Sequence, residues 1–383
     1  MKIGINGYEA VVPRFGYNKK TGLPNRVGSG EFCFQLLSKL AKLDTVNEYS
    51  VFLPVEPSSD MPKETEKWKY VVIQSKKLWT LLGLSRKLKN YKLDVFFSPT
   101  HYLPLYTSSS SVISILDVSY LYFPNLFKKR DLYQLKFWGG YSIKKAKKII
   151  TISNSSKNDI IKMYRVSPEK IAVVYPGIKP DLGLKIKDLR MNDLSKKYGI
   201  KRDYILFVGT LQPRKNIVRL IEAFSLIINH KSSVGDLSLV IVGKKGWQYE
   251  DILNAPKKYG VEDRVKFLDS ISDEDLPSLY KNALCFVLPS LYEGFGLPIL
   301  EAMQYGCPVA ASNVSSLPEA GGDAALYFDP ENVEDIRKNL ESIIQNPELR
   351  ERLIKKGYEQ VKKFSWEKTA RETLKVLQDL GVK

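Results

Sequence analysis

The chain of 383 residues is 44% hydrophobic and 26% charged, a composition that excludes a disordered or collagen-like protein. No apolar run approaches the roughly 18 residues that a membrane-spanning helix needs. The three cysteines are too few and too widely spaced for a disulfide framework or a cysteine zinc site, so we expect a cytoplasmic protein.

The net charge of +17 is unevenly placed along the chain. Residues 1–190 hold 32 Lys and Arg against 15 Asp and Glu, whereas residues 191–383 hold 27 of each kind. A basic surface attracts nucleic acid, anionic lipid headgroups or a phosphorylated substrate. The charge alone does not choose among these partners, and a solubility bias without any partner is the alternative.

Apolar runs of strand length alternate with helical patterns from end to end, which is typical of an α/β protein with parallel sheets. The predicted strands of the first half are 3–5, 49–53, 70–73, 95–97, 112–116, 148–152 and 171–174. Helices are predicted between them at 30–43, 78–89 and 154–164. The second half restarts the pattern, with a helix at 216–228 and strands at 204–208, 237–242, 265–268, 284–288, 309–311 and 325–328.

Residues 175–183 carry two prolines and two glycines without periodicity, which is the chemistry of turns and linkers. We therefore predict a first domain over 1–180, a linker over 181–200, a second domain over 201–364, and a final helix at 365–383 that opens with Ser365 as its cap. Ligands of open α/β sheets bind at the carboxyl ends of the strands. Two such domains predict a cleft whose ligand is held in part by each.

The densest cluster of functional residue types is the segment 289–303, which follows a predicted buried strand and leads into a helix. Gly294 and Gly296 allow backbone N–H groups to approach an anion just before a helix N-terminus. Glu293 lies in the loop and Glu301 is expected in the first helical turn, where each can accept hydrogen bonds from sugar hydroxyls. A tight strand-to-helix turn with acids near a helix start is the structural alternative.

A second loop of this kind spans 207–216. Arg214 and Lys215 stand at the predicted start of a helix, where the helix dipole disfavours positive charge. A bound anion, most simply a diphosphate, explains such a pair at the carboxyl end of a strand. The alternative is a solvated basic turn.

Three weaker candidates lie in the first half. Gly28, Ser29 and Gly30 precede a predicted helix and could present amides to a phosphate or only shape a turn. His101 follows a predicted strand, and either a ligand-site role or a loop-stabilising role fits it. Asp117 follows another and could orient a hydroxyl, or could form an Asx turn or a helix cap.

Several common motifs are absent from the sequence. Two histidines cannot build a histidine-rich metal site. No Gly-x-x-x-x-Gly-Lys-[Ser/Thr] loop occurs, and no Gly-x-Gly-x-x-Gly follows the first strand, which weakens the ATPase and standard dinucleotide interpretations. We therefore expect neither a metal nor a bound cofactor.

Glu293 and Glu301, eight positions apart, resemble the Glu-x7-Glu motif of the retaining glycosyltransferases of family 4. The stretches 153–157, 175–177, 209–216 and 242–247 are also similar to that family, and the resemblance is strong over about 150–350. The resemblance implies the GT-B fold, in which two Rossmann-like domains face each other across a cleft and the C-terminal helix crosses back to the first.

The resemblance also implies residue roles. Glu293 would contact the donor sugar and Glu301 the nucleotide ribose, while Arg214 and Lys215 would bind the diphosphate. The expected catalytic residues are Glu293, Arg214, Lys215, His101 and Asp117. The expected donor-binding residues are Gly28, Ser29, Gly30, Gly209, Thr210, Arg214, Lys215, Gly243, Lys244, Glu293, Gly294, Phe295, Gly296, Leu297 and Glu301.

Two departures from the family pattern affect these roles. Many relatives have His-Asp where this chain has Leu116 and Asp117, so either His101 contacts the sugar or no histidine does. Many also have an arginine where this chain has Thr210, which leaves Arg214 as the replacement.

The segments 98–104, 117–124 and 243–247 look most like bacterial members that transfer mannose, so GDP-mannose is the expected donor and UDP-sugars are the alternative. The expected acceptor is a glycan or a lipid-linked diphosphate. Transfer would need no metal, because cations and amides can stabilise the departing diphosphate. A non-catalytic protein that binds sugar nucleotides or polyanions is a rival interpretation, as is an epimerase.

The basic first half gains a specific interpretation from this resemblance. It could hold the enzyme peripherally on the anionic cytoplasmic face of a membrane. The candidate patches are 128–130 and 144–148, with Tyr120, Tyr122, Phe127 and Trp138 nearby. No helix-turn-helix or RNA-binding signature accompanies the charge, so we expect no nucleic-acid partner.

Overall fold

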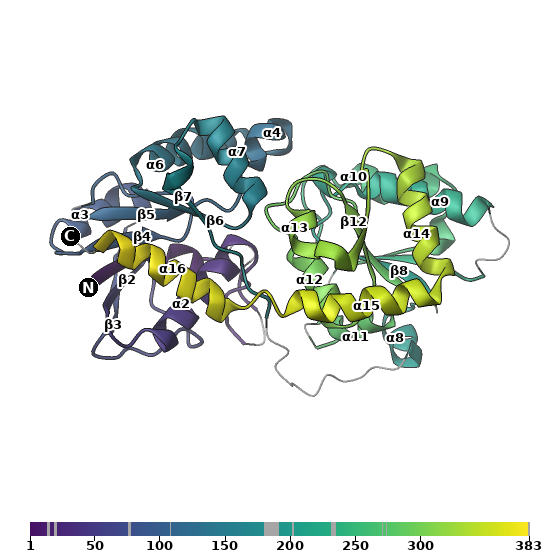
Figure 1. Cartoon of the computed structure of the whole chain (residues 1–383), viewed down its shortest axis with the longest axis horizontal. Helices are drawn as coiled ribbons and strands as arrows, with labels where there is room; N and C mark the ends of the chain where they lie inside the picture. The colour runs from purple at the N-terminus through teal and green to yellow at the C-terminus, as the bar shows by residue number, and fades with distance from the viewer. Residues whose placement is uncertain are drawn as a thin grey trace. The chain divides into compact units, whose positions relative to one another are not determined.

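The computed structural model describes residues 1–13, 16–18, 21–75, 78–107, 109–179, 191–200, 203–230, 235–269, 271–272 and 274–381. The chain divides into two compact units, one formed by Met1–Gly177 with Phe364–Lys383 and the other by Ile178–Lys363. Each unit is a parallel β-sheet flanked by helices (Figure 1). The predicted pair of Rossmann-like domains is therefore confirmed.

The first unit contains a seven-stranded sheet in the order β3-β2-β1-β4-β5-β6-β7, in which every neighbouring pair is parallel. Its strands are β1 (Lys2–Asn6), β2 (Glu48–Leu53), β3 (Trp68–Val72), β4 (Val95–Ser98), β5 (Ser110–Ser114), β6 (Lys148–Thr151) and β7 (Ile171–Val173). All seven predicted strands exist. The central strand β4 is buried along its whole length, as expected for a parallel strand covered on both faces.

The helices of the first unit lie in the connections between these strands, except α16, which follows the second unit in the chain. They are α1 (Tyr8–Val11), α2 (Ser29–Leu43), η1 (Trp79–Gly83), α3 (Leu84–Leu88), α4 (Ser119–Tyr122), η2 (Pro124–Leu126), α5 (Lys129–Gln134), η3 (Leu135–Gly139), α6 (Gly140–Lys145), α7 (Asn154–Tyr164), η4 (Pro168–Lys170) and α16 (Trp366–Gly381). The helix predicted at 78–89 is a π-helical turn followed by α3. Ile143 of α6 and Ile160 of α7 pack with the strand residues Phe96 and Ile113 in one core.

Helix α16 returns to the first unit, as the GT-B resemblance predicts. Trp366 at its start is buried and packs edge-on against Phe32 of α2, with ring centroids 5.8 Å apart. The Thr369 hydroxyl donates a hydrogen bond of 2.7 Å to the Tyr175 carbonyl. A Cβ on Gly177 would lie 2.1 Å from the Trp366 nitrogen. The backbone that leaves the first unit at Gly177 and the backbone that returns to it at Trp366 are therefore so close that only glycine fits at position 177.

The second unit contains a six-stranded parallel sheet in the order β10-β9-β8-β11-β12-β13. Its strands are β8 (Tyr204–Val208), β9 (Ser238–Val242), β10 (Val265–Leu268), β11 (Cys285–Leu288), β12 (Val309–Ser312) and β13 (Ala325–Phe328). All six predicted strands exist. Strands β9, β11 and β12 are buried throughout.

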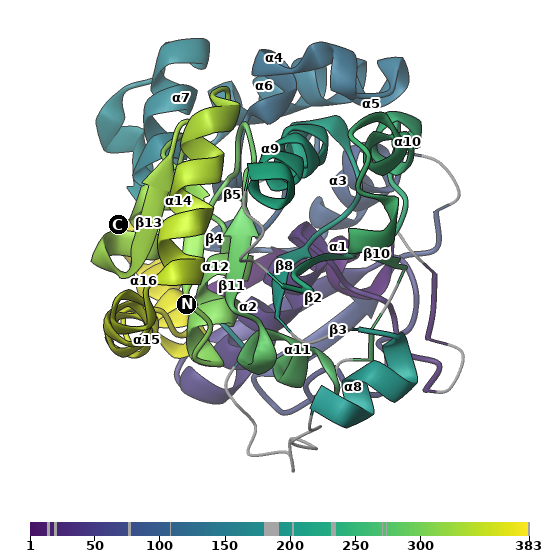
Figure 2. The same ribbon diagram turned by 90° about the vertical axis from the view of Figure 1, so that its right-hand side faces the viewer.

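Helices precede, connect and follow these strands. They are α8 (Met191–Tyr198), η5 (Pro213–Lys215), α9 (Ile217–His230), α10 (Glu250–Lys258), η6 (Glu262–Arg264), α11 (Leu276–Asn282), α12 (Leu297–Gln304), α13 (Leu317–Gly321), η7 (Gly322–Ala324), α14 (Val333–Gln345) and α15 (Pro347–Val361). Figure 2 faces this unit and shows α9 and α14 side by side.

Helix α8 occupies part of the predicted linker. Leu194 in this helix is fully buried, and Lys197 and Tyr198 both bind the Asp275 carboxylate before α11. These contacts attach 191–198 to the second unit, whereas 180–190 lie outside the described residues.

The described helices include none that is long and apolar enough to cross a membrane. All three cysteines are free and buried. Cys33 lies in α2, Cys285 in β11 and Cys307 just before β12, so each fills space in a core.

Candidate active site

The second unit gathers four loops at one edge of its sheet. Strands β9, β8, β11 and β12 are successive neighbours and all parallel, so the loops that follow them leave from the same edge. These loops are 209–216 after β8, 243–249 after β9, 289–296 after β11 and 313–316 after β12. Both of the strongest predicted motifs lie in them.

The loops after β8 and β9 lie against each other. The Gly209 N–H donates to the Val242 carbonyl at 2.9 Å, which extends the ladder beyond the strands. A Cβ on Gly243 would lie 1.8 Å from the Gly209 carbonyl oxygen, so only glycine permits this approach. The structure thus brings together the predicted donor-binding residues Gly209 and Thr210 with Gly243 and the exposed Lys244.

The Glu293 carboxylate is held by two cations and a hydroxyl. Lys215 Nζ lies 2.5 Å from Oε1, and Arg214 Nη1 lies 3.2 Å from Oε2. The Ser290 hydroxyl donates to Oε1 at 2.6 Å. The side chains of Glu293, Arg214 and Lys215 are only 12%, 16% and 11% exposed, which contradicts the solvated basic turn as an explanation of the pair.

Burial of Glu293 by itself raises the pKa of its carboxyl. The Lys215 and Arg214 charges and the hydrogen bonds outweigh this effect and lower the pKa to about 2. The carboxylate is therefore ionised at neutral pH and accepts hydrogen bonds without donating any. Because two cations face one carboxylate, the three side chains sum to a net charge of +1, which suits an anionic ligand.

Backbone contacts from three loops fix the position of Glu293. The Leu291 N–H donates to the Arg214 carbonyl at 2.9 Å. The Glu293 N–H donates to Ser315 Oγ at 2.9 Å, and the Ser316 hydroxyl donates to the Glu293 carbonyl at 2.8 Å. The carboxylate is thus held in place by the protein itself, which is the arrangement that electrostatic catalysis requires.

Residues 294–297 lead from Glu293 into α12. Gly294 and Phe295 are buried and Leu297 is half-buried, so the backbone amides are the groups of this segment best suited to meet a phosphate. Gly296 has a φ of +105°, and a Cβ there would lie 2.7 Å from Leu317 Cδ2, which makes glycine necessary.

Glu301 lies in the second turn of α12, and the expectation that it lies in the first turn is wrong. The helix begins at Leu297, one residue earlier than predicted, so four helical residues precede Glu301. Its Oε2 accepts a hydrogen bond of 3.3 Å from the Tyr280 hydroxyl on α11.

The candidate phosphate loop of the first unit packs against α1. Gly28 has a φ of +53° and caps α2. The Ser29 hydroxyl donates to Glu9 Oε2 at 3.0 Å. A Cβ on Gly30 would lie 3.0 Å from the Glu9 carbonyl oxygen, so Gly30 also allows a close approach between α2 and α1.

The other two candidates of the first unit follow the neighbouring strands β4 and β5. The His101 ring lies 6.2 Å from the Tyr102 ring, measured between centroids. Asp117 Oδ1 accepts a hydrogen bond of 2.9 Å from the Ser119 N–H and so forms an Asx turn at the start of α4. The Asx turn that was the alternative to a functional role for Asp117 is therefore present.

Two family models match this chain. The model described as "Glycosyl transferases group 1" matches residues 191–360, and the one described as "Glycosyltransferase Family 4" matches residues 73–182. The O-antigen chain mannosyltransferase B of Escherichia coli is 31% identical over 363 residues, which is 91% of this chain and 94% of that protein. The chain belongs to glycosyltransferase family 4.

Other relatives of this glycosyltransferase agree. The O-antigen chain mannosyltransferase RfbU of Salmonella typhimurium is 29% identical over 270 residues, 70% of each chain. The sucrose-phosphate synthase of Thermosynechococcus elongatus has a TM-score of 0.72 at 18% identity and covers 99% of both chains, which shows the common GT-B fold. Membership in family 4 implies a nucleotide-sugar donor and a glycan acceptor.

Three serines that hold Glu293 in this glycosyltransferase were not predicted from the sequence, namely Ser290, Ser315 and Ser316. A signal was available, because each of them follows a predicted strand of the second half. Polar residues at the carboxyl ends of parallel strands are the ones that line a site.

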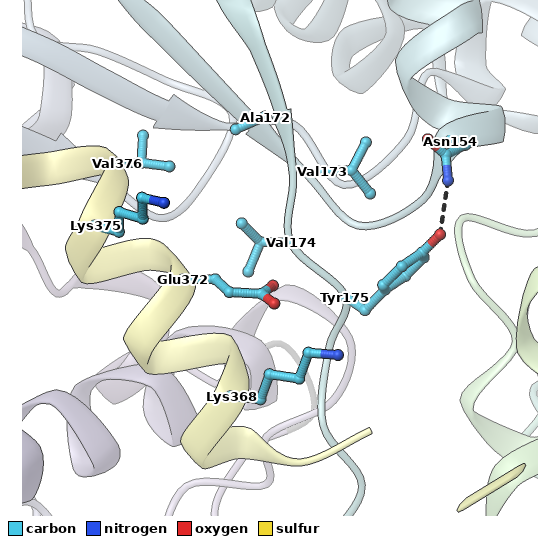
Figure 3. A pocket seen from close by; sticks show the side chains of 9 residues that line it. All are labelled: Asn154, Ala172, Val173, Val174, Tyr175, Lys368, Glu372, Lys375 and Val376. Atoms are coloured by element: carbon cyan, nitrogen blue, oxygen red, sulfur yellow. Dashed lines mark hydrogen bonds between the residues drawn. The ribbon is translucent and has the colours of Figure 1, made fainter. Parts of the chain in front are cut away.

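Each unit of the glycosyltransferase also has a pocket, and the one in the second unit adjoins the loops 209–216 and 289–296. A pocket of about 610 Å³ in the second unit is lined by residues that include Pro213, Asn216, Arg219, Asp251 and Leu291. A pocket of about 320 Å³ in the first unit lies between β7 and α16 (Figure 3). There the Asn154 amide donates to the Tyr175 hydroxyl at 2.6 Å, and Lys368, Glu372 and Lys375 project from α16.

Proposed function

We propose that this glycosyltransferase transfers mannose from GDP-mannose to a glycan acceptor in polysaccharide synthesis, with retention of anomeric configuration. Two relatives are O-antigen chain mannosyltransferases, and one of them aligns over nearly its whole length. The observation that carries the proposal is the Glu293 carboxylate held between Lys215 and Arg214. A sugar nucleotide needs both kinds of charge, a hydrogen-bond acceptor for the sugar hydroxyls and cations for the diphosphate.

In this proposal the second unit holds the donor. Lys215 and Arg214 bind the diphosphate together with the amides of 294–297. Glu293 accepts hydrogen bonds from the sugar, and Glu301 accepts them from the ribose. The remaining donor contacts come from Gly209, Thr210, Gly243 and Lys244, and from the loop Gly28, Ser29 and Gly30 of the first unit.

The chemistry follows from these charges. The bond between the sugar C1 and a diphosphate oxygen breaks while a bond from C1 to the acceptor oxygen forms on the same face, and the acceptor proton passes to the departing diphosphate. Negative charge grows on the diphosphate, where Lys215 and Arg214 stabilise it. Positive charge grows on the sugar ring, which an ionised Glu293 stabilises. With a pKa of about 2, Glu293 is not the proton donor at neutral pH.

The first unit, 1–180, would bind the acceptor. We assign His101 to the acceptor side because it follows β4 at the carboxyl edge of the first sheet. Asp117 would act there as a positioning residue, since its Asx turn shapes the loop after β5. A glycan or a lipid-linked diphosphate is the acceptor class that we propose.

Thermal unfolding in the presence of nucleotides tests the donor site. GDP, UDP and ADP would each be added at millimolar concentration, with and without EDTA, because a ligand that binds the folded state raises the Tm by mass action. We expect the largest rise with GDP, no effect of EDTA, and loss of the rise in Lys215→Met. Lys355→Gln, which changes an exposed lysine of α15, is the control and keeps the rise.

Other results would change the proposal in defined ways. A larger rise with UDP would replace GDP-mannose by a UDP-sugar. A GDP-dependent rise without mannose transfer to any glycan would indicate a non-catalytic binding protein. Loss of the rise in EDTA would contradict metal-independent donor binding, and no rise with any nucleotide would refute the donor site.

A further inference from the structure

The segment α5–η3–α6 forms one continuous helical stretch over 129–145 with two different faces. One face belongs to the core of the first unit. Gly139, Gly140 and Ile143 are buried, and Leu132 and Leu135 pack against the core cluster. A surface helix anchored in this way normally presents polar residues on its other face.

The outer face carries aromatic rings instead. Tyr133, Phe137 and Tyr141 recur every four positions and are 64%, 65% and 38% exposed. The Tyr133 and Phe137 rings stack on each other, with centroids 5.7 Å apart and planes inclined by 10°. A contiguous exposed apolar surface of this kind marks an interaction site more often than chance exposure.

Cations surround these rings. The stretch 129–145 contains five Lys and Arg but a single acid, Asp131. Lys129, Lys136 and Lys144 are exposed. Lys145 donates to the Pro104 and Leu105 carbonyls at 3.0 and 2.7 Å, which anchors this end of the helix to the loop after β4.

We propose that this surface, Lys129, Tyr133, Lys136, Phe137, Tyr141 and Lys144, lies against an anionic lipid bilayer. We call it the aromatic–basic face. A helix that lies flat in a membrane interface has this composition, because the rings enter the headgroup region while the lysines reach anionic headgroups. Single-stranded nucleic acid is the rival occupant, because exposed rings and cations also bind bases and phosphates, and it is one outcome of the test below.

The aromatic–basic face corrects the patch expected from the sequence. Tyr120 is 2% exposed, and its hydroxyl lies 2.6 Å from that of Tyr164. Phe127 packs against the core cluster, and Trp138 is half-buried. Tyr122, the remaining aromatic residue of the expected patch, is 36% exposed. The expected lysine runs 128–130 and 144–148 lie at the two ends of the helical stretch, and Tyr133, Phe137 and Tyr141 between them are exposed.

The same helix contacts the loop that carries the candidate acceptor-side histidine. The Trp138 ring packs edge-on against Tyr102, with centroids 6.3 Å apart, and the Tyr102 ring is the neighbour of His101. If the proposed function is correct, on which this step rests, an acceptor carried in the bilayer reaches His101 from the surface on which the helix lies.

Sedimentation with vesicles tests the docking without any sugar nucleotide. The full chain would be mixed with phosphatidylcholine vesicles that contain or lack phosphatidylglycerol. We expect binding to the anionic vesicles that is at least about a hundredfold tighter than to the neutral ones. Lys129→Gln/Lys136→Gln/Lys144→Gln should weaken it roughly a hundredfold, at about fivefold per cation near an anionic surface. Tyr133→Ser/Phe137→Ser should weaken it at least tenfold.

The control is a triple variant on α15 of the second unit, Lys355→Gln/Lys356→Gln/Tyr358→Ser, which removes two exposed lysines and an exposed tyrosine away from the aromatic–basic face. It should bind like the wild type, and all variants should keep the nucleotide-dependent rise in Tm. The docking proposal would be overturned if the wild type does not bind the anionic vesicles, or if the control variant weakens binding as much as the face variants do. Unchanged binding of the face variants would also overturn it. So would binding of single-stranded RNA in place of vesicles. None of these results bears on the donor site, so the two proposals fail separately.

Discussion

The ionic cluster of the second unit and the surface lysines of the first use charge in opposite ways. In the second unit, where residues 191–363 hold 23 Lys and Arg against 24 Asp and Glu, Glu293 is enclosed with Lys215 and Arg214 at the carboxyl edge of the sheet. In the first unit the excess cations lie at the surface, as Lys129 and Lys144 do. A buried charged side chain requires specific partners, so it fixes the relative positions of the residues around it. An exposed charged side chain contributes only to the electrostatic potential at the protein surface.

The hydrogen bonds around the two sets of loops differ in the same sense. In the second unit, loops after three different strands hold Glu293. In the first unit, Asp117 bonds to Ser119 within its own loop. In the proposed function, this contrast corresponds to a second unit that binds the nucleotide sugar and a first unit that binds the acceptor.

Removing the central cation should have the largest effect. Lys215→Met leaves Glu293 buried with one cationic partner, so we expect kcat with GDP-mannose to fall on the order of 10²–10³-fold. The free energy of unfolding should fall by about 3 kcal/mol. Both are measured directly, by product formation and by urea unfolding.

The double variant Lys215→Met/Glu293→Gln is the control for that experiment. It removes the unpaired charge, so it should recover most of the stability and none of the activity. Recovery of activity in the double variant would mean that the cation serves only to neutralise Glu293.

Two substitutions in the first unit distinguish a direct role of a side chain in the reaction from a role in shaping a loop. His101→Ala should lower kcat/KM for the acceptor about 10²-fold without changing GDP affinity. Asp117→Asn should change it less than about threefold, because the Asn Oδ1 can still accept from the Ser119 N–H. A large loss in Asp117→Asn would show that its charge matters to the reaction.

The stability of the second unit should depend on pH through Glu293. Its pKa of about 2 in the folded protein lies below the ordinary value of 4.5, so its contribution is complete above about pH 4.5 and is lost as the pH falls toward 2. At pH 3 the wild type should have lost about 2 kcal/mol more, relative to pH 7, than Glu293→Gln. Urea unfolding between pH 7 and 3 measures this difference. If the free energy of unfolding falls equally with pH in the wild type and in Glu293→Gln, then ionisation of Glu293 does not contribute to stability.

A second carboxylate of the same unit shows that a low pKa does not by itself identify a site. The pKa of Asp275 is lowered to about 2: burial would raise it, but the hydrogen bonds from Lys197 and Tyr198 outweigh that effect. These bonds attach α8, so Asp275→Asn should cost about 1–2 kcal/mol of stability and leave kcat unchanged. A lower kcat at unchanged Tm would contradict a purely structural role for Asp275.

The strands could be predicted because parallel strands buried on both faces read as continuous apolar runs. The strand predicted at 112–116 is β5, which begins two residues earlier, at Ser110. The prediction missed its first two residues because Ser110 and Ser111 are polar. The members of the ionic cluster were also predictable from their residue types and loops. Their direct pairing was not, because Lys215 and Glu293 lie 78 positions apart and only the neighbouring positions of β8 and β11 bring them together.

The outward direction of the aromatic residues was least predictable. The π-helical turn η3 changes the helical phase between Tyr133 and Tyr141, so simple helical spacing does not assign their faces. Tyr120 reads as a surface residue beside lysines, yet it is buried against Tyr164, 44 positions away. Contacts at such separations leave no local pattern.

The return of α16 has a consequence for the order in which the protein forms during synthesis. The first unit lacks Trp366 and the rest of α16 until about 190 residues beyond Gly177 have left the ribosome. At about 5–20 residues per second this delay lasts roughly 10–40 s. During that time Phe32 and the α2 surface that α16 covers are without their partner, so the first unit made is the last to be completed.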